Sequence, residues 1–334
     1  MTERCIKSLT PIYAVSDYIE RCAESLFRQT LEEIQFIFVD DASPDDSVAR
    51  LEQTLERFPN RKAHTIILHH PHHRSLPEAR ATGLAYAQAP FVAHCDSDDY
   101  VEPDMYERLY NTAVIEKADM VICDSVFHYR NGTQVISRSW RVSSNDPLND
   151  FIYGRSRRTV WCRLTKTDIY RRVEFSADNY MEDWVQVVQL LAYCQNVAYL
   201  PEPLYHQMQN PKSIMGDRRL AVVEESVRQC KANYAKVHDF LIEKRLALES
   251  DFTEMKTFVR TRYYPLLLRF RGRRTYLQTF PELNAQLLSS PYIEKPYKFA
   301  HICILLGIFP LVYPIAQPLH RRYLAWRRSS LVSI

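Results

Sequence analysis

Three aspartates follow an apolar run and are the residues whose type and spacing most suggest chemistry. The run at residues 91–95 ends in Asp96, Asp98 and Asp99. An apolar segment of this length is typical of a buried parallel strand, so the carboxylates would lie at its C-terminal end, where open α/β sheets bind ligands. Hard oxygen ligands on a short loop suit Mg²⁺ or Mn²⁺. A solvated acidic turn is the alternative, because aspartates also favour turns.

Two further acidic pairs could complete a site. Asp40 and Asp41 directly follow the apolar run 34–39, and Glu182 and Asp183 precede an apolar series with helical spacing. A strand-end carboxylate can bind the base or ribose of a nucleotide, while a metal ion held by another bridges its phosphates. A third acid, Asp183, could be the general base that takes a proton from an acceptor hydroxyl. At a helix start it could instead be only a cap or a dipole partner.

The elements that must position these acids alternate between strand and helix. Strands are expected at residues 6–13, 34–39, 65–68 and 91–95, with helices from residue 16 and at 47–58 and 76–87 between them. This alternation predicts an α/β fold with a doubly wound, mostly parallel sheet and right-handed crossovers. A helix at 106–116, strands at 120–123 and 135–141, and a loop with a short helix at 143–158 should follow. Apolar steps of three and four from residue 221 predict a long amphipathic helix.

Composition bounds the class of protein. The chain has 334 residues, enough for one large domain or for one domain with a smaller appendage. Eight cysteines occur without a CxxC pair, and residues 1–7 lack the apolar region of a signal peptide, so we expect a reducing, cytosolic environment. There is no Walker loop and no GxGxxG motif.

The C-terminal part of the chain is basic. Residues 260–334 hold 12 Lys or Arg against two Glu, so they carry a charge of +10 and the remainder carries −7. Residues 299–319 contain no charged side chain, but Pro310, Pro314 and Pro318 argue against a plain membrane-spanning helix. We therefore expect this segment to dock on an anionic membrane surface without crossing it. The alternative is a tail that packs on the protein's own body. Nucleic-acid binding is disfavoured, because the basic residues flank an apolar block.

Four histidines lie close together at positions 69, 70, 72 and 73. They could form a metal site, but Pro71 and the lack of helical spacing favour a solvated loop.

In this order the motifs resemble those of family 2 of the inverting nucleotide-sugar glycosyltransferases, which have the GT-A fold. The similarity extends over roughly residues 5–215. Three positions depart from the family pattern: Ala14 and Ala81 replace Asn, and Ala42 replaces Gly. The matching segments are Pro11-Ile12-Tyr13-Ala14, Ser25-Leu26-Phe27-Arg28-Gln29-Thr30, Val39-Asp40-Asp41-Ala42-Ser43, Ala79-Arg80-Ala81-Thr82-Gly83-Leu84, Asp96-Ser97-Asp98-Asp99 and Glu182-Asp183-Trp184.

The resemblance implies a role for each matching position. Asp183 would be the catalytic base, and Asp99 with Asp98 would hold Mn²⁺ or Mg²⁺. The residues implied to bind the nucleotide sugar are Pro11, Tyr13, Asp41, Arg80, Asp96, Asp98 and Glu182.

The resemblance also implies an organisation and an activity. A GT-A domain would span residues 1–215, with a nucleotide-sugar-binding half at 1–124 and an acceptor half at 125–215. A helical extension at 216–290 and a membrane-associating tail at 291–334 would follow. The expected activity is transfer of a sugar, with a UDP-sugar as the default donor, to a glycan or lipid-linked glycan, with inversion, during assembly of a surface polysaccharide on the cytoplasmic face of the membrane. A degenerate nucleotide-sugar-binding relative and a metal-dependent phosphohydrolase are the alternatives.

Overall fold

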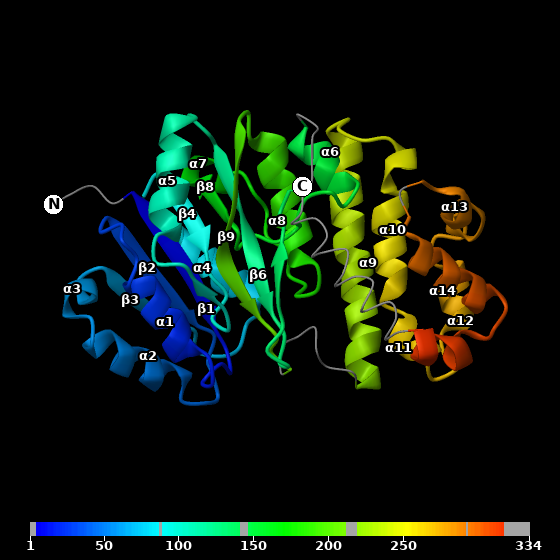
Figure 1. Cartoon of the computed structure of the whole chain (residues 1–334), viewed down its shortest axis with the longest axis horizontal. Coiled ribbons are helices and arrows are strands. Elements are labelled where there is room, and N and C mark those ends of the chain that lie inside the picture. The colour runs from blue at the N-terminus through cyan, green and yellow to red at the C-terminus, as the bar shows by residue number, and fades with distance from the viewer. Residues whose placement is uncertain (1–4, 87–88, 141–145, 212–218, 292, 317–334) are drawn as a thin grey trace. The chain divides into compact units, whose positions relative to one another are not determined.

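The computed structural model describes residues 5–86, 89–140, 146–211, 219–291 and 293–316 (Figure 1). The chain divides into two compact units. Unit 1 comprises Met1–Ser143 with Arg157–Asn210, and unit 2 comprises Ser144–Ser156 with Pro211–Ile334. The division into domains predicted from the sequence stays a proposal.

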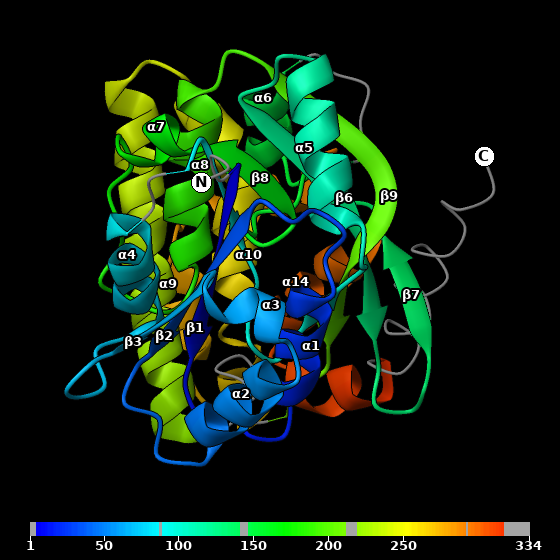
Figure 2. The same ribbon diagram turned by 90° about the vertical axis from the view of Figure 1, so that its left-hand side faces the viewer.

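Unit 1 is built on one mixed sheet with the strand order β3-β2-β1-β4-β8-β6-β9-β5, and β7 pairs with β6. The first four strands are parallel, and Figure 2 shows β1, β2 and β3 side by side. β8 is antiparallel to both β4 and β6, whereas β9 is parallel to β6. The strands are β1 (Ile6–Ile12), β2 (Ile34–Asp40), β3 (Thr65–His69), β4 (Phe91–His94), β5 (Tyr100–Val101), β6 (Met120–His128), β7 (Gln134–Ser137), β8 (Arg163–Lys166) and β9 (Val197–Met208).

Helices join the parallel strands, as the alternating pattern predicted. Every residue of β1 and β2 is buried, so both faces of these strands are covered. This explains why β2 is largely apolar and does not alternate, whereas β1 also buries Lys7, Ser8 and Thr10. α1 buries Ile19, Cys22 and Leu26, which are spaced for one helical face. The helices of unit 1 are α1 (Ile19–Phe27), α2 (Ser47–Glu56), α3 (Pro59–Lys62), α4 (Leu76–Ala85), α5 (Met105–Ile115), α7 (Thr167–Tyr170) and α8 (Glu182–Tyr193).

Unit 2 is helical. The long amphipathic helix expected from residue 221 is α9 (Leu220–Glu243). The buried Arg260 donates hydrogen bonds to the carbonyls of Thr279 (2.6 Å) and Phe280 (2.7 Å), so it ties α10 to the loop after α12. The other elements are α6 (Pro147–Ile152), a 3₁₀ turn η1 (Glu249–Phe252), α10 (Thr253–Thr261), α11 (Tyr264–Leu267), α12 (Arg273–Gln278), α13 (Leu283–Ser289) and α14 (Lys295–Leu305). The expected helical C-terminal extension is thereby confirmed.

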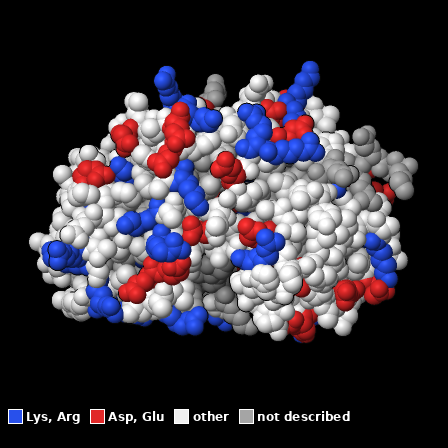
Figure 3. Space-filling view, turned by 180° about the vertical axis from the view of Figure 1, so that it is seen from behind, with Lys and Arg blue, Asp and Glu red and all other residues white. Residues whose placement is uncertain are grey.

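The surface and the described helices bear on the membrane prediction. On the face drawn in Figure 3, basic and acidic side chains are intermingled. Within the described part of the chain, no helix combines the length and the apolar character that crossing a membrane requires. Residues 317–319 of the predicted docking segment lie outside the described residues.

Candidate active site

One buried arginine connects three acids from two separate stretches of unit 1. Arg80 lies in α4 and is 1% exposed. Its Nη1 donates to Asp183 (2.6 Å) and Glu182 (2.9 Å), and its Nη2 donates to Asp96 (2.9 Å). The sequence assigned Arg80 to nucleotide-sugar binding, whereas the structure directs its guanidinium to three protein carboxylates.

Local geometry places the acidic pair. Met181 has a left-handed backbone (φ 65°) immediately before α8, so Glu182 and Asp183 stand in the first helical turn. There the helix dipole favours negative charge. The side chain of Asp183 bonds Arg80 across the fold, which goes beyond a local dipole role.

Charge is unbalanced around Arg80. Burial alone would lower the pKa of the Arg80 guanidinium, but Asp183, Asp96 and Glu182 raise it well above its usual value, so it stays charged. Burial and the neighbouring Asp183 raise the pKa of Glu182 well above its ordinary range. Burial also raises the pKa of Asp183, and Arg80 opposes that rise. One guanidinium therefore faces three carboxylates, and Asp183 keeps a raised proton affinity, as a general base needs.

The loop after β4 is held by β9. Both carboxylate oxygens of Asp99 accept hydrogen bonds, from the Tyr205 hydroxyl (2.8 Å) and the Met208 amide (2.7 Å), and Asp99 is 3% exposed. Asp98 accepts one from the Asn210 amide group (3.0 Å). In this conformation Asp99 supports the loop, and Asp98 is more accessible than Asp99.

The carboxylates of this loop fit a divalent cation in their chemistry. Burial and the neighbouring Asp96 raise the pKa of Asp98 to about 6, and burial with Asp98 raises that of Asp99 well above its usual value. A hard cation would relieve this repulsion, and Mn²⁺ and Mg²⁺ prefer such oxygen ligands. Among the described residues, no three His, Cys, Asp or Glu side chains are already arranged to hold a metal. The metal roles of Asp98 and Asp99 stay predictions.

Asp41, at the end of β2, is surrounded by donors. Its Oδ1 accepts from the His70 ring (2.7 Å) and the Arg74 amide (2.9 Å), and its Oδ2 accepts from the Ser75 amide (3.0 Å). The Nδ1 atom of His73 lies 2.8 Å from Oδ2 and can form an ion pair with it. Asp41 is 2% exposed. We expected this residue to contact the nucleotide base, and the structure shows a carboxylate that the protein itself already satisfies.

The two histidines around Asp41 are functional candidates that sequence reasoning missed. His70 is buried and also bonds Thr82 (2.9 Å), so the expectation of a solvated loop is wrong for it. The ring of His73 stacks on that of Tyr13 with centroids 4.1 Å apart, and Tyr13 is 45% exposed. The strand register explains the contact: β2 and β3 pair in parallel with Asp40 opposite His69, which places His70 beside Asp41.

Two of the departures from the family pattern have a strained backbone. Ala14 (φ 54°) and Ala42 (φ 57°) are in the left-handed region, where the Gly or Asn of the family pattern is accommodated more easily. The Ala14 amide donates to the Ser43 hydroxyl (2.8 Å), which joins the two turns. Pro11 is a buried residue of β1.

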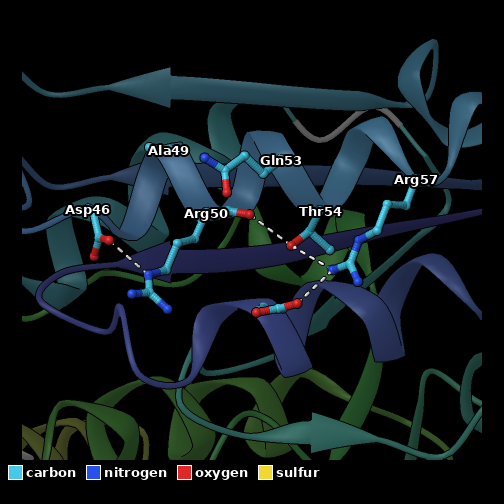
Figure 4. Close-up of a pocket in the computed structure, with 7 residues that line it drawn as sticks. Asp46, Ala49, Arg50, Gln53, Thr54 and Arg57 are labelled. Carbon is cyan, nitrogen blue, oxygen red and sulfur yellow. Dashed lines mark hydrogen bonds and ion pairs between the residues drawn. The ribbon is translucent and has the colours of Figure 1, made fainter.

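A charged groove between α1 and α2 is separate from these residues (Figure 4). Arg50 pairs with Asp46 (2.9 Å), and Arg57 pairs with Glu20 (3.0 Å), all with exposed side chains. None of the predicted site residues lines this groove, so the candidate active site is the acidic cluster around Arg80 and the loop after β4.

The comparisons with known proteins concern the family and the fold. Residues 9–173 match the model of "Glycosyl transferase family 2". A "Putative glycosyltransferase EpsH" of Bacillus subtilis is 26% identical over 269 residues, which are 78% of this chain and 75% of that protein.

Two solved structures share the fold. TarS 1–349 of S. aureus in complex with UDP-GlcNAc has a TM-score of 0.60 at 13% identity, covering 91% of this chain and 88% of that one. The mannosyltransferase PcManGT of Pyrobaculum calidifontis, in complex with GDP-Man and Mn²⁺, has a TM-score of 0.56 at 14% identity, covering 93% and 87%. The GT-A fold expected from the sequence is confirmed.

Proposed function

We propose that the chain moves a sugar from a nucleoside diphosphate sugar to a hydroxyl, with inversion. Residues 9–173 belong to glycosyl transferase family 2, and the chain is accordingly a glycosyltransferase. The observation that carries the proposal is Asp183, a carboxylate of raised pKa fixed by Arg80 beside the acidic loop. A protein that only bound a nucleotide sugar would not need such a base.

The reaction assigns a task to each group. Asp183 takes the proton of the acceptor hydroxyl while the oxygen of that hydroxyl attacks the anomeric carbon of the sugar. The bond from that carbon to the diphosphate breaks, and the electron pair leaves with the nucleoside diphosphate. Arg80 holds Asp183 in place and favours its ionised form, against the effect of burial. A divalent cation, held by Asp98 with its neighbour Asp99, would supply neutralisation of the leaving diphosphate.

The nucleotide is proposed to be UDP, the commonest donor nucleotide of the family. The complex of TarS with UDP-GlcNAc supports this choice, and that of PcManGT with GDP-Man makes guanine the main competitor. Tyr13 and Asp41 would lie at the base and Asp96 at the ribose or diphosphate.

The acceptor is proposed to be a glycan or a lipid-linked glycan of a surface polysaccharide, with no nucleic acid involved. The enzyme would work in the cytoplasm, peripheral on the inner face of the cell membrane. The support for this placement is the exposed apolar face of α14, where Phe299 and Ile302 are 50% and 41% exposed.

A panel of nucleotide sugars tests the proposal. The purified chain with Mn²⁺ should gain thermal stability with its donor by mass action, and should release nucleoside diphosphate when a glycan acceptor is added. Release of inorganic phosphate would favour a phosphohydrolase instead. Donor binding without turnover, in a protein whose Asp183→Asn variant behaves identically, would identify a binding relative. No response to any donor would overturn the proposal.

A further inference from the structure

Unit 2 carries an exposed apolar surface that folding does not explain. It comprises α14, residues 306–316 and the turn 269–274, whose last two residues begin α12, and we call it the docking surface. Eight of its large apolar side chains are exposed. They are Phe270 (70%), Phe299 (50%), Ile302 (41%), Leu305 (36%), Leu306 (67%), Ile308 (38%), Leu311 (65%) and Ile315 (77%).

α14 is apolar on two faces. One face, with Ala300, Cys303 and Ile304, is buried in the core of unit 2 against Tyr263 and Tyr264 among others. The opposite face presents large apolar side chains at helical spacing. Only the first face therefore packs on the protein's own body, as the alternative prediction for the tail requires. A helix that served this core alone would carry polar residues on its second face, so the second face is free to meet another apolar phase.

The turn 269–274 provides an independent observation. Phe270 has a left-handed backbone (φ 56°), which is rare for a bulky residue, and yet its side chain gains little burial. An aromatic residue that is both strained and exposed supports the hypothesis that it has a function. Four basic residues are close to it in the sequence: Arg269, Arg271, Arg273 and Arg274.

Hydrogen bonds join the turn to α14. Arg273 donates from Nε to the Ile304 carbonyl (2.8 Å) and from Nη2 to the Leu305 carbonyl (2.7 Å), so Phe270 and its arginines lie near the C-terminal end of the exposed helix face. Lys295 and Lys298 occupy the first turn of α14. Basic side chains therefore stand at both ends of an apolar strip.

We propose that the docking surface binds an anionic phospholipid membrane, with Phe270 and the exposed face of α14 entering the headgroup region. This proposal rests on the proposed peripheral localisation and specifies the surface responsible for it. It does not depend on which sugar is transferred. An apolar strip with a basic collar is the pattern of an interfacial helix. The basic side chains attract anionic lipid, and an aromatic side chain suits the interface. Basic side chains outnumber the acidic ones at this surface, where Glu294 precedes Lys295 and Glu224 lies 3.9 Å from Arg271, and this excess complements an anionic membrane.

The test is co-sedimentation of the full chain with vesicles of phosphatidylcholine alone or with about 30% phosphatidylglycerol at low salt. The full chain should pellet with the anionic vesicles only. Phe270→Asn suits the left-handed backbone, so it should keep the fold and lower binding about tenfold. Leu306→Ser with Leu311→Ser should lower it at least as much. Ile115→Asn, at a 79% exposed residue of unit 1, is the matched control and should bind like the unchanged chain.

A charge variant separates the two contributions. Arg271→Glu with Arg274→Glu should lower binding to anionic vesicles by roughly tenfold or more, since each basic residue near the surface adds to the attraction. Arg271 only approaches Glu224 at 3.9 Å, so little of the fold depends on it.

Three results would overturn the proposal. They are a full chain that stays in the supernatant with both vesicle types, surface variants that bind as the unchanged chain does, and surface variants that change the mass in solution, which would identify a contact between copies. A chain ending at residue 316 tests residues 317–334: if it alone loses binding, they and not the docking surface carry it. Donor binding, measured in parallel without vesicles, reports on the proposed function separately.

Discussion

One carboxylate, Asp41, and a cluster of five carboxylates in unit 1 are stabilised in opposite ways. Asp41 accepts hydrogen bonds from three donors of the protein and lies 2.8 Å from the Nδ1 atom of His73. The acidic site, by contrast, comprises Asp96, Asp98, Asp99, Glu182 and Asp183 with a single buried arginine, Arg80, bonded to three of them. The first is complete without a ligand, whereas in the second burial and neighbouring carboxylates raise the pKa values of Asp98, Asp99 and Glu182. This difference supports the proposal that cation, substrate and proton transfer belong to the acidic site and not to Asp41.

Removing the basicity of the acidic site should have the largest effect. Asp183→Asn keeps the shape of the side chain but cannot accept the proton, so turnover should fall by about 10²- to 10⁴-fold. Donor binding, measured by calorimetry, should be retained. Asp168→Asn, at an exposed carboxylate paired with Arg171, is the control. Loss of donor binding together with turnover would show that Asp183 is structural.

Metal removal tests the excess charge directly. EDTA should abolish transfer and Mn²⁺ should restore it, and Asp98→Asn should weaken Mn²⁺ binding. Protons compete with the metal for Asp98, whose pKa burial and Asp96 raise to about 6, so metal affinity should rise as the pH increases through about 6 and then level off. Calorimetric titration of Mn²⁺ between pH 5 and 8 measures this. Full activity in metal-free buffer would show that the acidic site needs no cation, which is the main difference proposed between it and Asp41.

His70→Ala should affect stability before chemistry. It takes away one donor to Asp41 and the partner of Thr82, and a buried polar group left unsatisfied costs about 1–3 kcal/mol. Chemical denaturation should show this loss, while the exposed neighbour His72, changed to Ala, should leave the free energy of unfolding within experimental error. An unchanged stability in His70→Ala would mean that Asp41 is not held by its donors as described.

The smallest effect concerns the turn after Asp41. Ala42→Gly removes a side chain from a left-handed position, so it should stabilise the fold by about 1 kcal/mol. Ala49→Gly in α2, where Ala suits the helix and is exposed, should destabilise it by about the same amount. The denaturant midpoint measures both changes in stability. If both substitutions changed the stability in the same direction, the left-handed backbone at Ala42 would not be a source of strain.

The regular part of the fold and the acidic positions could be predicted because their causes are local. Apolar runs such as residues 34–39 and 91–95 reveal buried strands, and the carboxylates at their ends follow from the sequence alone. The partners of those carboxylates could not be predicted. Asp99 bonds Tyr205 and Met208, more than 100 residues later, because β5 pairs with β9.

The role of Arg80 was also beyond reach of the motifs. Its motif indicated ligand binding, but whether a guanidinium faces a substrate or a carboxylate depends on how α4 packs against α8. The histidines at 70 and 73 were misjudged for the same reason, since only the strand register brings them to Asp41.

The shared arginine has a consequence for how this domain can be divided or engineered. Arg80 lies in the N-terminal half, but two of its three bonded carboxylates, Glu182 and Asp183, are supplied about 100 residues later. A fragment that ended near residue 124 would keep Asp96 as the acceptor of Arg80 Nη2 but would leave Nη1 without both carboxylates that accept from it. A buried charged donor that loses its acceptors is destabilising. The predicted nucleotide-sugar-binding half should therefore not fold as a portable module. Exchange of the predicted acceptor-binding segments between relatives should keep the Glu-Asp pair with the arginine, because the donor and the acceptors of these hydrogen bonds come from different parts of the chain.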